Sequence, residues 1–144
     1  MAHMHASMLP EGSVVATGTG SACPLSASDA RSAVERLLGT RCGASLRETA
    51  VIDALLATSE LVTNAIRHAG GVTGFVAHLT SDGRGLELGV SDASDQEPVT
   101  GGPPEPGTPG GFGWPMILRI CQAVRVHREP GRVGKTIVVR LALH

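Results

Sequence analysis

The spacing of apolar residues predicts a long central helix. Apolar positions recur at helical intervals over residues 46–69, and Gly70 and Gly71 end the pattern. The residues expected to form its buried stripe are Val51, Ile52, Leu55, Leu56, Val62, Ile66 and Ala69. We therefore expect this helix to pack its stripe against the rest of the fold.

Two shorter helices are predicted on either side of it in the sequence. Ser26 is suited to be an N-cap, with Asp29 three residues later as in a capping box, and Gly39 is the expected end of that helix. The other helix begins at Trp114 and Pro115, because proline fits the first turn. Its expected apolar side consists of Ile117, Leu118 and Cys121.

Short strands fill the intervals between these helices. They are predicted at residues 14–16, 72–79, 86–91, 124–128 and 135–143, with hairpin turns at 81–85 and 129–132. The last strand alternates most regularly, with Ile137, Val139, Leu141 and Leu143 on one face. Between Gly101 and Gly113, ten of thirteen residues are Gly or Pro, so we expect a long functional loop there.

Composition narrows the class of protein. The length of 144 residues predicts one domain over residues 9–144, after a tail at residues 1–8. A formal net charge of −1 and scarce aromatic residues argue against direct nucleic-acid binding. Acidic and basic residues interrupt the apolar runs, which argues against a membrane span. Three widely spaced cysteines and no export signal favour a cytoplasmic protein.

Polar residues on the long helix are candidates for chemistry. Glu60, Asn64 and His68 are spaced i, i+4, i+8 and share one stripe, placed by a helical wheel nearly opposite the apolar one. Such a stripe is either a solvated face or the wall of a pocket. In a pocket, the Asn oxygen suits Mg²⁺ and the carboxylate can accept a proton from an attacking hydroxyl.

Two further segments suit nucleotide binding. A buried carboxylate at Asp92, after a strand, would accept a hydrogen bond from an exocyclic amine such as adenine N6. The glycines before the helix that begins at Trp114 allow close approach of phosphate to backbone N–H groups. Gly134-Lys135-Thr136 is not a P-loop, because Glu129 stands at the leading glycine position and a strand follows.

The order of these motifs resembles the histidine-kinase-like ATPase (GHKL) superfamily. Residues 60–69 (ELVTNAIRHA) resemble its N-box, residues 90–98 (VSDASDQEP) its first glycine box, and residues 110–113 its second. Gly134-Lys135-Thr136 resembles the Gly-Thr that opens the last strand near the base. Because the chain is short, it most resembles the anti-sigma regulatory factor and serine-protein kinase branch, in its small actinobacterial form.

This resemblance implies a Bergerat-type α/β sandwich, with helices on one face of a mostly antiparallel mixed sheet and a lid over ATP at residues 94–113. Glu60 would be the general base, Asn64 the Mg²⁺ ligand and Asp92 the adenine acceptor. The full implied nucleotide site is Asn64, Arg67, His68, Asp92, Ser94, Gly110, Gly111, Phe112, Gly113 and Thr136. Arg31 would lie at a partner surface.

The branch implies a function as well. Its members hold a sigma factor inactive and phosphorylate a serine of an anti-anti-sigma (STAS-type) partner, commonly as homodimers. Ser94 and Gln96 stand where the first glycine box usually has glycines. That departure keeps open an alternative, a regulatory binding module with weak or absent ATP binding and no kinase activity. A phosphoryl-transfer domain of a two-component histidine kinase is disfavoured, since no helix pair carrying a phospho-acceptor His is evident.

Overall fold

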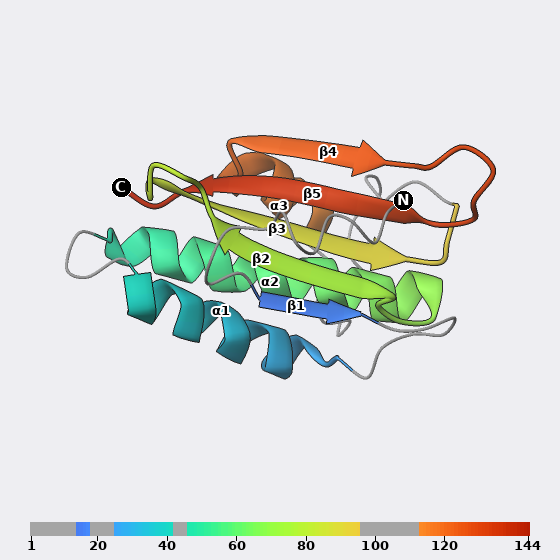
Figure 1. Ribbon diagram of the computed structural model, residues 1–144, viewed down its shortest axis with the longest axis horizontal. Coiled ribbons are helices and arrows are strands. Elements are labelled where there is room, and N and C mark those ends of the chain that lie inside the picture. Colours follow the sequence, from blue (N-terminus) through green and yellow to red (C-terminus); the bar gives the residue numbers. More distant parts are fainter. Residues whose placement is uncertain (1–13, 18–24, 42–45, 96–112) are drawn as a thin grey trace.

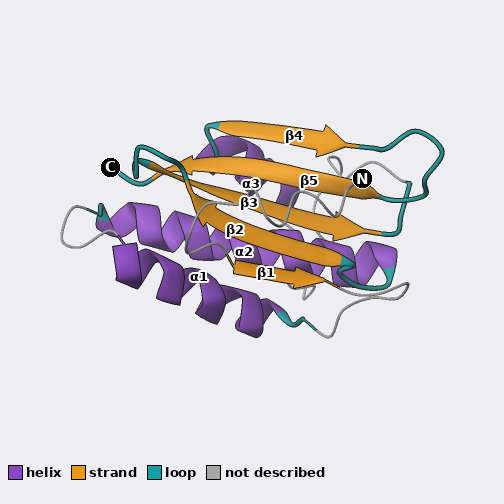
Figure 2. Cartoon of the chain, in the orientation of Figure 1, coloured by secondary structure: helices purple, strands orange, loops and turns teal. Residues whose placement is uncertain are grey.

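The protein is a single twisted sheet with helices on one face (Figures 1 and 2). A computed structural model describes residues 14–17, 25–41, 46–95 and 113–144. The elements, in chain order, are β1 (Val14–Thr17), α1 (Ala27–Arg41), α2 (Glu48–Ala69), β2 (Gly74–Leu79), β3 (Gly85–Asp92), α3 (Gly113–Ile120), β4 (Ala123–His127) and β5 (Lys135–Ala142). The predicted tail at 1–8 and most of the predicted loop at 101–113 lie outside the described residues.

The strands are ordered β1-β2-β3-β5-β4, and each described pairing is antiparallel. β3 and β5 form the centre, with Asp92 opposite Lys135 at one end of the ladder. Helix α2 packs on β3 and β5 between α1 and α3. The predicted α/β sandwich with its helices on one face is therefore confirmed.

Local sequence signals place the helix ends. The Ser26 hydroxyl accepts a hydrogen bond from the Asp29 backbone N–H at 3.0 Å, and the Asp29 carboxylate accepts one from the Ser26 N–H, so the predicted capping box is present. Gly70 ends α2 in the left-handed conformation, with φ of 76°. The expected stop at Gly39 is wrong, because α1 continues to Arg41.

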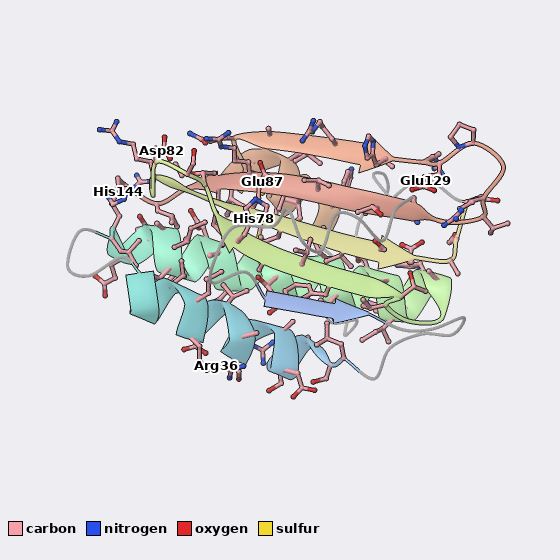
Figure 3. All side chains as sticks on the ribbon, in the orientation of Figure 1. Arg36, His78, Asp82, Glu87, Glu129 and His144 are labelled. Carbon is pink, nitrogen blue, oxygen red and sulfur yellow. The ribbon has the colours of Figure 1, made fainter. Side chains whose placement is uncertain are left out.

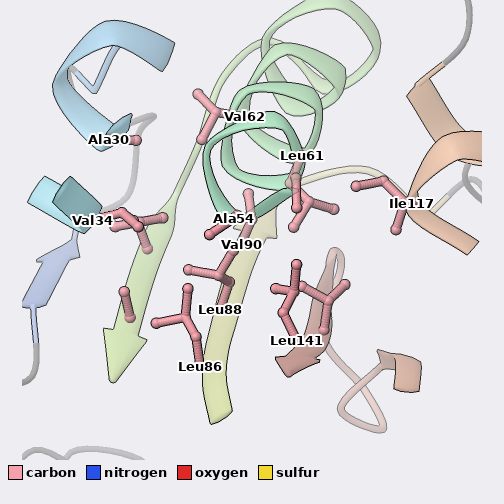
Figure 4. Packing of buried hydrophobic residues seen from close by; sticks show 14 of the residues in the cluster. Ala30, Val34, Ala54, Leu61, Val62, Leu86, Leu88, Val90, Ile117 and Leu141 are labelled. Carbon is pink, nitrogen blue, oxygen red and sulfur yellow. The ribbon is translucent and has the colours of Figure 1, made fainter. Parts of the chain in front are cut away.

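The core lies between the sheet and α2 (Figure 4). Alternate residues of the central strands supply the sheet side, namely Leu86, Leu88, Val90, Ile137, Val139 and Leu141. Leu143, just beyond β5, is also buried, which confirms the predicted alternation of the last strand. These aliphatic side chains form one continuous layer under the helices.

The buried face of α2 differs from the predicted stripe. Its buried residues are Ala50, Ala54, Ala57, Thr58, Leu61, Val62 and Ala65. Ile52, Leu56 and Ile66, expected in the core, are 39–52% exposed. Four of these seven are alanines, whose small side chains let a helix approach a sheet closely, and Ile52, Leu56 and Ile66 are left on the outer side. The Glu60–Asn64 stripe therefore borders the buried face and does not lie opposite to it.

Helix α3 shows a smaller difference of the same kind. Trp114 and Ile117 are buried and Cys121 is half-buried. Leu118, expected on the same apolar side, is 53% exposed.

Of the described helices, α2 alone is long and apolar enough to span a membrane by length and composition. Its packing against the sheet accounts for that composition without a membrane.

Candidate functional site

Glu60 stands at the junction of α2 and α3. Its half-buried carboxylate lies against Gly113, the first residue of α3, so closely that a Cβ built on Gly113 would collide with Glu60 Oε2. This oxygen is buried and has no hydrogen-bond partner among the described residues. Burial raises the pKa of the Glu60 carboxyl, and the positive charge of Arg67 partly opposes that rise. Glu60 thus has a half-buried carboxylate whose buried oxygen is an unused acceptor.

The other candidate residues of α2 follow Glu60 toward the end of the helix. Asn64, one turn on, is half-buried, whereas Arg67 and His68 are exposed. The helix then ends at Gly70, and the Thr73 N–H donates to the Ser91 carbonyl at 2.8 Å. This contact joins the end of α2 to the end of β3, where Asp92 lies. The last turn of α2 and Asp92 therefore belong to the same end of the fold.

Asp92 is buried and paired with a lysine. Lys135 Nζ lies 3.0 Å from both Asp92 Oδ1 and Asp92 Oδ2, and 3.5 Å from the carbonyl oxygen of Ser94. The Ser94 backbone N–H donates to Asp92 Oδ1 at 2.9 Å. Asp92 is 7% and Lys135 8% exposed, so the pair is shielded from water. The predicted adenine acceptor is thus held in an internal ion pair.

A second interaction, a hydrogen bond, joins the predicted first glycine box to the turn before β5. Asp95 Oδ1 accepts a hydrogen bond from the Gly134 N–H at 2.9 Å. Gly134 has a φ of 111°, and a Cβ there would collide with the Asp92 carbonyl oxygen. Only glycine meets both demands. The segment from Asp92 to Asp95 is therefore held by the turn before β5.

A pocket of about 230 Å³ lies beside this pair. Its walls come from the ends of β3 and β5 and from the turn after β4, which holds Glu129 (Figure 3). Thr136 lines it, and the Thr136 hydroxyl shares a 2.7 Å hydrogen bond with the Ser91 hydroxyl. Thus Thr136 and Asp92 share one pocket. None of the described residues lining it comes from α2, so Glu60 and Asn64 are placed outside it.

The remaining candidates divide into two groups. Arg31 Nη1 donates to the Ser59 hydroxyl at 3.0 Å, which ties α1 to α2. Gly110, Gly111 and Phe112 lie outside the described residues, as does most of the expected lid. Their assignment to the phosphates stays a prediction.

Lys135 was missed as a candidate, although the sequence carries a signal for it. It is the only lysine of the chain, since the other eleven basic residues are arginines. It also lies on the buried face of the last strand, two residues before Ile137. A charged residue at a core-facing strand position predicts a buried partner of opposite charge. Asp92, at the end of a neighbouring strand, is that partner.

Comparison with known proteins adds one match. A protein-family model described as a histidine kinase-like ATPase domain matches residues 21–141, and so includes every described candidate of the site. No curated protein matches the sequence.

Proposed function

The chain belongs to the histidine kinase-like ATPase domain family, and from this premise we propose that it is a cytoplasmic Mg·ATP-dependent serine kinase and anti-sigma factor. Its partners would be a sigma factor, which it sequesters, and an anti-anti-sigma protein of the STAS type, whose serine it phosphorylates. The observation that carries this proposal is the Glu60 carboxylate, half-buried and with one oxygen unpaired.

The described residues of α2 fit a magnesium nucleotide. Glu60 Oε2 is an orphaned acceptor, which a metal-bound water or a substrate hydroxyl would satisfy. The Asn64 side-chain oxygen, one turn away, is a hard ligand of the kind that Mg²⁺ prefers. Asn64 would thus hold the metal, with Arg67 and His68 toward the phosphates. Bound ATP would supply the transferable phosphoryl group.

The environment of Glu60 suits a general base. Because burial raises its pKa, the Glu60 carboxylate is a stronger base than an exposed glutamate. Glu60 would accept the proton of the partner's serine hydroxyl as the oxygen attacks. Its contact with Gly113, the first residue of α3, sets it beside the segment that the resemblance assigns to the phosphates. Base and nucleotide would then meet at the α2–α3 junction.

Phosphate transfer tests this proposal. Wild type, Glu60→Gln and Glu35→Gln are incubated with γ-labelled ATP, Mg²⁺ and a candidate anti-anti-sigma protein. Glu35 is exposed on α1, so its substitution controls for loss of one negative charge. We expect E60Q to lose at least about 100-fold in rate, in line with general-base catalysis, and E35Q to match wild type. Equal rates for E60Q and wild type would remove Glu60 from the mechanism.

A second function is favoured by the buried pair of Asp92 and Lys135. Because Lys135 already contacts both oxygens of Asp92, the base-recognition acceptor is occupied. This supports the alternative of a binding module that holds a regulator with little or no nucleotide. Calorimetry separates the two functions. Heat of binding with millimolar ATP and Mg²⁺ that disappears in Asn64→Ala supports the kinase, and no heat in wild type supports the module.

A further inference from the structure

We propose that Lys135 determines the base selectivity of the nucleotide site by occupying the position on Asp92 that the amine of an adenine would take. This inference rests on the proposed nucleotide site. It concerns which purines the site distinguishes, and it depends on the pair of Asp92 and Lys135.

The contacts of Asp92 leave few hydrogen-bond acceptor positions for a ligand. A carboxylate has about four acceptor positions. Lys135 Nζ and the Ser94 N–H both donate to Oδ1, and Lys135 Nζ also lies 3.0 Å from Oδ2. One position on Oδ2 is left, and the pair is at most 8% exposed. An incoming amine could therefore reach Asp92 only at that one shielded position, unless it displaced the ammonium group.

The ammonium group is the stronger donor of the two. Both donors would make a hydrogen bond to the carboxylate, but only the ammonium group adds the attraction between two opposite charges, which is strong where water is excluded. Displacing Lys135 would also leave a buried cation without its partner. The site therefore keeps its ion pair when a nucleotide binds, and the 6-amino group adds no bond to Asp92.

The surrounding backbone holds this arrangement in place. Lys135 is the first residue of β5, directly opposite Asp92 in the ladder, so strand pairing sets the two side chains side by side. The hydrogen bond from Gly134 to Asp95 fixes the same turn. Strand pairing therefore keeps the backbone of Lys135 beside Asp92. The selectivity that it sets is a property of the fold.

Two nucleotides test the proposal directly. ATP and purine riboside triphosphate differ only in the 6-amino group. Trp114, the only tryptophan, is buried beside Gly113 and provides a fluorescence signal, with calorimetry as the second readout. Wild type should bind the two nucleotides within about threefold. Lys135→Met should prefer ATP at least tenfold, because Asp92 then needs a donor.

A control variant and the contrary outcomes complete the experiment. Arg132→Met removes a positive charge from the same pocket, where the Arg132 side chain is 71% exposed, and should leave the ratio unchanged. A tenfold preference of wild type for ATP, or no gain of preference in K135M, overturns the inference while nucleotide binding stands. Absence of binding by either nucleotide overturns the proposed function and the inference together. The wild-type comparison stands even if K135M does not fold, and Lys135→Gln is the second variant.

Discussion

The carboxylate of Glu60 touches the backbone of Gly113, so α2 and α3 meet where a charged group is shielded from water. The contact explains two properties at once. Gly113 has no side chain because the Glu60 carboxylate fills that space, and the Glu60 pKa is raised because α3 covers the carboxylate. Changing either residue should therefore alter the other in a measurable way.

Glu60→Gln should stabilise the protein at neutral pH. The folded-state pKa of Glu60 lies above the ordinary value of 4.5, so the folded protein binds its proton more tightly than the unfolded chain does. Wild type therefore loses stability as the pH rises from about 4.5 through the folded pKa, and the uncharged amide does not. Urea unfolding of E60Q and wild type between pH 4 and 8 should show a difference near zero at the acid end that grows with pH. A constant difference would contradict the raised pKa.

Gly113→Ala tests the same contact from the other side. The atom that the new methyl group meets is the tip of a flexible side chain, so Glu60 can swing away at little cost. We expect stability to change by less than about 1 kcal/mol, since alanine also favours the helix. The pKa of Glu60, followed by carboxyl-carbon NMR, should fall toward its ordinary value as the carboxylate reaches water. An unchanged titration would show that the methyl group is accommodated elsewhere.

Gly134→Ala should be far more damaging than G113A. The new Cβ would meet the carbonyl oxygen of Asp92, which is backbone, and the φ of 111° is strained for any other residue. Strain of this kind costs roughly 1–3 kcal/mol before the overlap is counted. Thermal unfolding should show a loss of several degrees or more. Gly39→Ala, with nothing within 4 Å of its Cβ, is the matched control and should be neutral or stabilising.

The buried face of α2 can be tested by a pair of truncations. Leu61 is 1% exposed, so Leu61→Ala should cost about 2–5 kcal/mol. Ile52 is 52% exposed, and Ile52→Ala should change the free energy of unfolding by no more than about 0.5 kcal/mol. Urea unfolding of the two variants measures both values. Equal costs, or the reverse order, would mean that the helix is rotated from the orientation described above.

Prediction from the sequence succeeds for features that are set locally along the chain. Element order, strand alternation, the capping box at Ser26 and the end of α2 at Gly70 were all predictable, because each depends on residues close together in the chain. The orientation of α2 was not. Large apolar residues appear on more than one side of the helix, and the sheet selects the side on which alanines permit close packing.

The candidate site also has one part that depends on local sequence and one part that depends on the folded sheet. The i, i+4 spacing of Glu60 and Asn64 is a local property, and the sequence was sufficient to find it. The pairing of Asp92 with Lys135 joins residues 43 positions apart and depends on strand register. Strand register is set only when the whole sheet has formed, so this pairing could not be predicted from either segment alone. Asp92, predicted to bind the amine of an adenine, is instead paired with Lys135.

Cys121 should be an unreactive thiol in the folded protein. Burial, with a smaller contribution from the negative charge of Asp53, raises its pKa to about 12, so almost none of it is thiolate at pH 8. Iodoacetamide should modify Cys121 at least about 100-fold more slowly in native buffer than in urea, as followed for its own peptide by mass spectrometry. Asp53→Asn should speed the native reaction only modestly, because desolvation is the larger cause. Equal rates in buffer and urea would contradict the burial of this thiol at the end of α3.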